Sequence, residues 1–149
     1  MLFRRYGQAV LVTHERTSRF TVVTRQPNKA AQPVLDSLMA CFSRLPAALR
    51  RSITFDNGTE FAHHHRLNLA LGLQTFFCDP HAPWQKGGIE NAIGRLRRPL
   101  PRKSDLAAIS QEDLNDITAT YNNTPRQCLG FRTPAEVFTS FLNRVALET

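Results

Sequence analysis

Two carboxylates, Asp56 and Glu90, stand where this chain could do chemistry. Asp56 directly follows a predicted strand at 53–55, so its side chain would open onto the edge of a sheet, where α/β proteins place their ligands. Glu90 lies near the start of a predicted helix, beside its buried stripe. Each also has a purely structural explanation, because Asp-Asn-Gly is ordinary turn chemistry and a helix N-terminus favours a carboxylate. Neither residue alone identifies a site.

Cations follow Glu90 along the same predicted helix and just beyond its end. Arg97 comes seven positions after Glu90, about two helical turns, so the two side chains share a face. The other members of this basic cluster are Arg95, Arg98, Arg102 and Lys103. The helix dipole favours cations near a helix C-terminus, and phosphate contact is the alternative explanation.

Strands and helices alternate along the chain. A β-hairpin is predicted at 8–13 and 20–24, with further strands at 53–55 and 74–78. Apolar residues spaced three and four apart predict helices at 30–45, at 63–71 and from 89 towards the prolines at 99 and 101. Capping signals open two more helices, at Ser110 and Thr133. This order predicts one α/β domain over 1–149 with a mixed sheet.

The chain of 149 residues carries a net charge of +7, and its pI is about 10.2. A basic surface favours a polyanion, most often nucleic acid, with an acidic membrane surface second. No apolar run approaches the roughly 18 residues that cross a bilayer, and the run at 9–12 is too short for a signal peptide. Three cysteines without a C-x-x-C pair argue against a disulfide framework or a thiolate zinc site, so we expect a reducing cytoplasm.

Five segments, taken together and in order, resemble one known family. They are ERTSRF at 15–20, DNGTEFA at 56–62, FCDPHAPWQKGGIEN at 77–91, NNTP at 122–125 and LGFRTPAE at 129–136. With these segments the chain resembles the catalytic core of the DDE-type insertion-sequence transposases, specifically the insertion-sequence-thirty branch. The likeness covers essentially the whole chain. The departures from the family pattern, none of which removes a metal ligand, are Ala82, Lys86, Gly88 and Ile89.

The resemblance implies an RNase H-like mixed sheet flanked by helices in residues 1–105, followed by C-terminal helices in 106–149. In that family three carboxylates hold two Mg²⁺ or Mn²⁺ ions, which prefer oxygen ligands. By this match Asp56 and Glu90 are catalytic, metal-binding residues, and their carboxylates should approach within about 8 Å.

The resemblance also implies DNA as the partner. Arg97 matches a residue that contacts DNA phosphate, and we expect Lys86 and some of the basic cluster beside it. The implied reaction is metal-dependent DNA cleavage and strand transfer. It implies a bacterial, cytoplasmic and nucleoid-associated protein that acts on transposon ends and target DNA, as a homo-oligomer of transposase subunits and without a membrane partner.

The first aspartate of the family's triad has no counterpart. The family places it on the first strand, just before the predicted hairpin, and no acidic residue precedes Glu15. Neither Glu15 nor Asp36 matches its position. The family's upstream helix-turn-helix region is absent too, so the chain resembles a C-terminal piece of a transposase without its first strand. We expect residues 1–5 to substitute for that strand only in part.

Two other functions stay open. The chain could be a non-catalytic fragment that binds DNA or another transposase, or a basic RNA-binding protein in which the spacing of Asp56 and Glu90 is coincidental. The histidines at 63–65 are interpreted as a solvated helix start, because adjacent helical side chains do not converge on one ion. Trp84 is expected to anchor its loop, with base stacking as the alternative.

Overall fold

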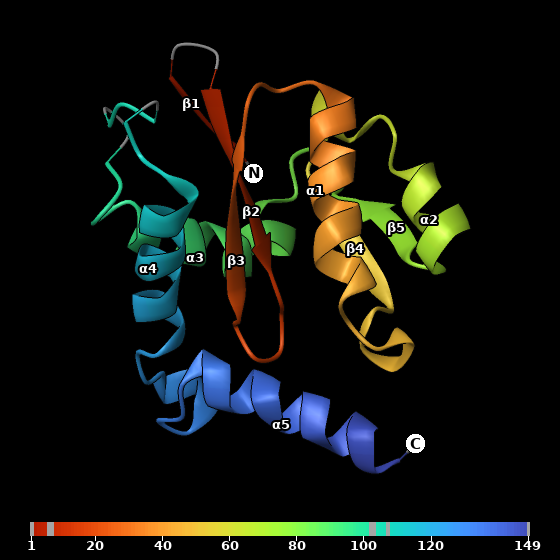
Figure 1. Ribbon diagram of the computed structural model, residues 1–149, viewed down its shortest axis with the longest axis vertical. Coiled ribbons are helices and arrows are strands. Elements are labelled where there is room, and N and C mark those ends of the chain that lie inside the picture. Colours follow the sequence, from red (N-terminus) through yellow and green to blue (C-terminus); the bar gives the residue numbers. More distant parts are fainter. Residues whose placement is uncertain (1, 6–7, 102–103, 107, 149) are drawn as a thin grey trace.

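Two small sheets form the centre of the computed structural model, which describes residues 2–5, 8–101, 104–106 and 108–148. The first is antiparallel, with the order β1 (Leu2–Arg5), β2 (Gln8–His14), β3 (Thr21–Gln26). The second is a parallel pair of β4 (Ser52–Phe55) and β5 (Gln74–Phe77). Figure 1 shows the helices arranged around these strands.

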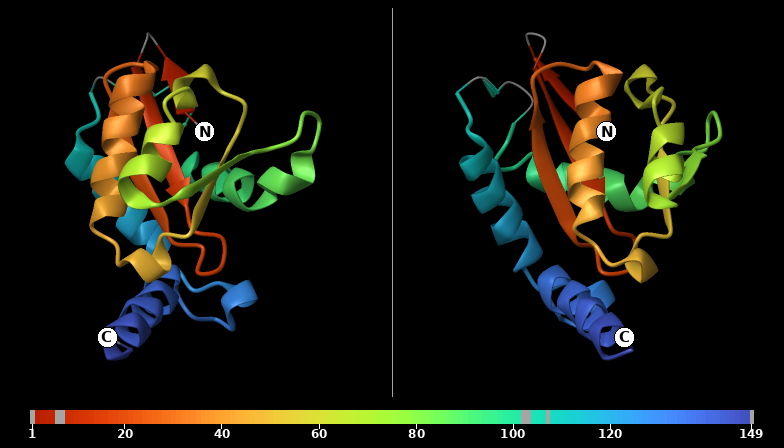
Figure 2. Two further views of the ribbon diagram at one scale, coloured as in Figure 1. Left: turned by 90° about the vertical axis from the view of Figure 1, so that its right-hand side faces the viewer. Right: turned by 45° about the vertical axis from the view of Figure 1, so that its right-hand side comes forward.

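The helices lie on both sides of the antiparallel sheet. They are α1 (Ala31–Ser43), α2 (His65–Leu71), α3 (Gly87–Leu96), α4 (Gln111–Asn122) and α5 (Pro134–Leu147). Short 3-10 helices occupy connections, namely η1 (Ala47–Leu49), η2 (Thr59–Phe61), η3 (Pro83–Lys86) and η4 (Gln127–Leu129). Figures 1 and 2 show α1 on one side of the sheet, α4 on the other and α5 below its end. No helix of the described residues combines the length and apolarity needed to cross a membrane.

Side chains of β2 enter two different hydrophobic cores, because successive residues of a strand point to opposite faces. Val10 and Val12 pack in the first core with Ile93 and Leu96 of α3 and Leu114 of α4. Leu11 points the other way. The second core that it enters also contains Val34, Leu35, Leu38, Phe55, Phe61, Leu67 and Leu73.

The expectation of a missing first strand needs a correction. Leu2–Arg5 forms β1, which runs antiparallel to β2 with Leu2 opposite Leu11 and Arg5 opposite Gln8. Its residues are Leu, Phe, Arg and Arg, so this strand supplies no carboxylate. β1 is only four residues long and, within the described residues, is not hydrogen-bonded to β4. The mixed sheet is therefore divided into an antiparallel and a parallel part.

The capping signals are confirmed. Ser110 and Thr133 each accept a hydrogen bond from the backbone N–H of the third helical residue, whose carboxylate in turn accepts one from the backbone N–H of the cap residue. Each of these reciprocal pairs satisfies two backbone N–H groups that a helix start leaves unpaired. Gly72 closes α2 in the left-handed conformation, with φ of 65°, which glycine adopts without steric cost.

One side chain ties the C-terminal helices to the strands. Asn122, buried at the end of α4, accepts a hydrogen bond at Oδ1 from the backbone N–H of Thr21 at 2.9 Å. Its Nδ2 donates to the backbone carbonyl of the same residue at 2.8 Å. Because β3 lies at the edge of its sheet, Asn122 supplies partners that no neighbouring strand provides. The division of the chain at 105 and 106 stays an interpretation, since α4 shares a core with β2.

We predict that Asn122→Ala destabilises the fold by about 3 kcal/mol, because it leaves two buried backbone groups without partners. Asn123→Ala is the matched control, since Asn123 is the next residue and is exposed. Urea denaturation measures both. Equal losses of unfolding free energy in the two variants would contradict the role given to Asn122.

Candidate active site

Asp56 lies at the carboxyl edge of the parallel sheet. In the β4–β5 pair Phe55 is opposite Phe77, so Asp56 and Cys78 follow the two strands at the same edge. The backbone N–H of Cys78 donates to the carbonyl of Phe55 at 2.9 Å. The side chain of Asn57 donates to the carbonyl of Cys78 at 3.0 Å. These bonds hold the two chain segments together directly beside the Asp56 carboxylate.

The Asp56 carboxylate is half-buried, and one of its oxygens is a buried acceptor without a hydrogen bond. Oδ1 is inaccessible to solvent and has no hydrogen-bond partner among the described residues. A buried polar atom left this way costs about 1–3 kcal/mol. A hard divalent cation is the natural partner for such an oxygen. Asp56 thus fits the metal-binding role that the sequence suggested for it.

Hydrogen bonds between Asp79 and Gln85 close the loop that leads from β5 to α3. Gln85 accepts a hydrogen bond at Oε1 from the backbone N–H of Asp79, and its Nε2 donates to Asp79 Oδ2, both at 2.8 Å. The Asp79 carboxylate is therefore occupied within its own loop. Trp84 next to Gln85 is 77% exposed, so the expectation that it anchors its loop is wrong. Its open ring leaves base stacking as the remaining interpretation.

Glu90 is exposed in the first turn of α3. The predicted buried stripe is confirmed, since Ala92, Ile93 and Leu96 are buried. At 100° per residue, Arg97 returns to within about 20° of Glu90 around the helix axis. Arg97 is half-buried and directly follows α3 as its C-terminal cap residue. These two side chains share the face that the sequence predicted.

The rest of the basic cluster is distributed more widely. Arg95 is exposed, lies about 140° around the helix from Glu90, and donates through Nε to Asn91 at 3.0 Å. Arg98 is exposed and Lys86 is half-buried. Arg102 and Lys103 lie outside the described residues. The helix geometry thus places Arg95 further from the Glu90 face than Arg97.

The first turn of α3 rests against the β2–β3 hairpin. A Cβ on Gly88 would lie 3.1 Å from Nη1 of Arg19 and 3.5 Å from Nε2 of His14. His14 Nδ1 is 3.0 Å from Thr21 Oγ1, which fixes the ring at the end of β2. The sequence analysis found the hairpin motif but not this contact, because no local pattern predicts which helix a turn meets. The contact positions the turn that carries Glu90.

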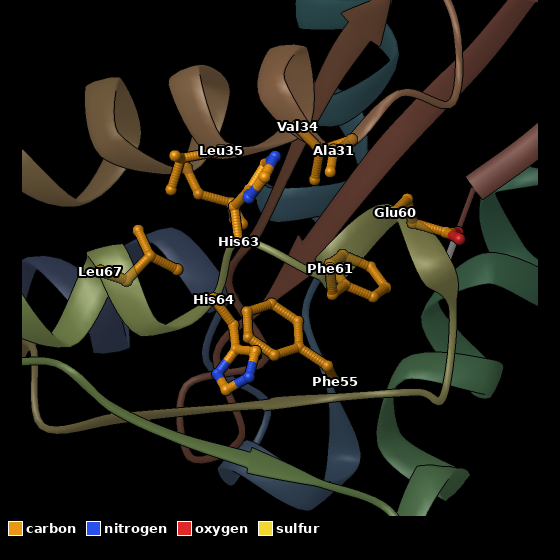
Figure 3. A pocket seen from close by; sticks show the side chains of 10 residues that line it. Ala31, Val34, Leu35, Phe55, Glu60, Phe61, His63, His64 and Leu67 are labelled. Atoms are coloured by element: carbon orange, nitrogen blue, oxygen red, sulfur yellow. The ribbon is translucent and has the colours of Figure 1, made fainter.

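The histidine run is not the cation site, and two of its members were misjudged. His65 is exposed, as a solvated helix start requires. His63 and His64 are instead half-buried, and His64 Nδ1 lies 2.9 Å from Thr75 Oγ1, so the interpretation is wrong for these two residues. Figure 3 shows His63 and His64 lining a small pocket between α1 and the η2–α2 segment. Mostly apolar side chains of the second core line this pocket, so it does not continue the candidate site.

The candidate site has two potential metal ligands rather than three. Within the described part of the chain, no three His, Cys, Asp or Glu side chains gather as a metal site would require. Asp56 and Glu90 are thus candidate ligands without a third carboxylate grouped beside them. Their assignment as metal ligands stays a prediction.

We predict that His14 makes stability depend on pH. Burial, and secondly the charge of Arg19, lower the pKa of His14 to about 4 in the folded chain, against about 6.5 in an unfolded chain. The unfolded state therefore binds more protons between these values. The free energy of unfolding should fall by about 2 kcal/mol as the pH drops from 6.5 to 4, and this contribution is complete above pH 6.5.

Urea denaturation at a series of pH values measures this dependence, and NMR titration of the ring gives the midpoint directly. The variant His14→Gln is the control and should lack this part of the pH dependence. A ring midpoint near pH 6.5 in the folded protein would contradict the prediction.

The sequence aligns with transposases over most of its length. It is 40% identical over 134 residues to the transposase for insertion sequence element IS1086 of Cupriavidus metallidurans, covering 90% of this chain and 40% of that protein. It is 40% identical over 123 residues to the transposase for IS30A of Escherichia coli K12, covering 83% and 32%. The chain thus spans well under half the length of these relatives. No protein-family model matches it.

The fold is that of an integrase core. The chain superimposes on the catalytic core domain of BIV integrase with a TM-score of 0.74 and 20% identity, covering 98% of this chain and 95% of that one. A chain of the simian T-cell lymphotropic virus intasome gives a TM-score of 0.70, covering 87% and 47%. These likenesses confirm the predicted RNase H-like fold. Over most of its length, the chain is similar in sequence to transposases of the insertion-sequence-thirty family.

Proposed function

We propose that this chain is the catalytic core of a DNA transposase, the part that carries out metal-dependent DNA cleavage and strand transfer. The observation that carries the proposal is the unpartnered, buried Oδ1 of Asp56 at the carboxyl edge of β4 and β5. A family relationship over most of the chain supports it. The proposal gives Asp56 and Glu90 the roles of catalytic carboxylates and ligands for Mg²⁺ or Mn²⁺.

Each residue has a separate task in this proposal. The carboxylates of Asp56, at the end of β4, and of Glu90, in the first turn of α3, would hold the cations. When bound, two divalent ions supply Lewis acidity for in-line substitution at phosphorus. Arg97, beside Glu90 on the same helix face, binds a DNA phosphate and keeps the scissile strand in register. Lys86 and Arg98 extend this basic surface.

The same proposal implies the binding partners and the cellular location of the chain. The partners are transposon ends and target DNA, reached by a homo-oligomer of transposase subunits at the bacterial nucleoid, in the cytoplasm. A basic chain with a net charge of +7 suits such a partner. The alternative function is that of a non-catalytic fragment that binds DNA or another transposase. It is favoured by the finding that no three potential ligands gather in the described residues.

We predict that Mn²⁺ at saturating concentration raises the melting temperature of the chain by about 3 °C, because a ligand that binds only the folded state stabilises it. Asp56→Asn and Glu90→Gln should each abolish the rise. Asp36→Asn is the matched control, since Asp36 is exposed on α1. Differential scanning calorimetry gives the shifts. An equal rise in Asp56→Asn and Asp36→Asn would contradict the metal assignment.

The 149-residue chain alone should not transfer DNA strands. Two-metal catalysis needs fixed ligand geometry, and the loss of one ligand costs orders of magnitude in rate. The assay uses a pre-cleaved DNA end with Mg²⁺ or Mn²⁺, and Asp56→Asn and Glu90→Gln exclude contaminating nuclease. Robust strand transfer that both variants abolish would show that the site is complete without a further carboxylate.

A further inference from the structure

The turn between β2 and β3, residues 15–20, is closed by side-chain hydrogen bonds and has no role in the proposed function. Glu15 accepts hydrogen bonds from the backbone N–H of Thr17 and from both the backbone and hydroxyl of Ser18. Burial acts to raise the pKa of Glu15, but these hydrogen bonds outweigh it and lower the pKa. The Glu15 carboxylate therefore stays ionised and is occupied inside the turn.

Arg19 leaves this turn in an unusual conformation. Its φ is 63°, in the left-handed region, which costs a residue with a Cβ about 1 kcal/mol or more. The side chain crosses to α3, where its Nη1 would lie 3.1 Å from a Cβ on Gly88. Gly88 is in the first turn of α3, two residues before Glu90. The unfavourable backbone conformation of Arg19 thus places its guanidinium beside the candidate active site.

The Arg19 guanidinium lies beside the positive end of a helix. No acidic side chain of the described residues forms an ion pair or hydrogen bond with Arg19, and the nearby Glu15 carboxylate is used within the turn. The first turn of a helix carries partial positive charge. The Arg19 charge also lowers the pKa of His14, which is its neighbour at Gly88. An anion that joined the half-buried Arg19 guanidinium at this helix start would be attracted both by its charge and by the helix dipole.

We propose that Arg19 binds a backbone phosphate of a DNA strand that lies over the first turn of α3. This inference rests on the proposed function and extends it, since it adds a contact from the hairpin to the surface of Lys86 and Arg97. A guanidinium suits a phosphodiester because its N–H groups form paired, charge-assisted hydrogen bonds with phosphate oxygens. In this proposal DNA contacts two elements, the β2–β3 hairpin and α3, near the first turn of α3.

Salt-dependent DNA binding tests the proposal. Fluorescence anisotropy with a short labelled duplex compares the 149-residue chain with Arg19→Gln, Arg16→Gln and Arg97→Gln. Arg16 is the matched control because it is exposed in the same turn and its loss changes net charge equally. We expect Arg19→Gln to weaken binding about tenfold at low salt, and to reduce the log–log salt slope by about 0.9. Arg16→Gln should leave the slope nearly unchanged.

Further variants separate a folding defect from a lost contact. Arg19→Lys keeps both the charge and the backbone cost, so it should retain the slope, and melting temperatures confirm that each variant is folded. Equal behaviour of Arg19→Gln and Arg16→Gln would overturn the inference, as would a folded Arg19→Lys that loses the slope. A normal Arg97→Gln together with an impaired Arg19→Gln would support Arg19 and count against the proposed role of Arg97. Wild-type protein that does not bind DNA would overturn both proposals.

Discussion

The two-sided packing of β2 is the constraint on which the candidate site depends. Asp56 follows Phe55, which is anchored in the second core, whereas Glu90 is carried by α3, whose Ile93 and Leu96 are anchored in the first. Leu11 enters one core and Val10 and Val12 enter the other, so a single strand joins the two halves of the site. The relative placement of the two carboxylates is therefore set by side chains that lie far from either of them.

Hydrogen bonding contributes less to this placement than an unbroken sheet would. The antiparallel and parallel sheets share no ladder within the described residues, so packing and the hairpin contact at Gly88 hold β4 and α3 in relation. Close-packed interiors transmit small displacements, because their side chains interlock with few voids. A displacement of β2 would therefore change the distance between the two carboxylates more than the hydrogen bond of Asn57.

The local architecture was predictable because its signals are local. Caps at Ser110 and Thr133, the left-handed Gly72 and the apolar stripe of α3 follow from residue type and spacing, and the structure confirms them. Family resemblance supplied the fold and the predicted roles of Asp56 and Glu90, which spacing alone left open between a turn, a dipole interaction and a site.

Contacts between distant segments were not predictable in this way. Asn122 pairs with Thr21 across 100 intervening residues, and Arg19 meets Gly88 through a backbone conformation that nothing in its neighbours demands. His64 and Trp84 were misjudged for the same reason, because burial is decided by what the rest of the chain brings to them. The four-residue β1 likewise depends on a distant partner only in part, since it pairs along β2.

Anomalous diffraction from crystals grown with MnCl₂ tests the central claim most directly, since it locates the cation and both carboxylates together. The account predicts a manganese peak with oxygens of Asp56 and Glu90 as ligands at about 2.1 Å, the two carboxylates lying within about 8 Å of each other. Manganese bound only elsewhere, or Asp56 and Glu90 on opposite faces of the fold, would contradict it.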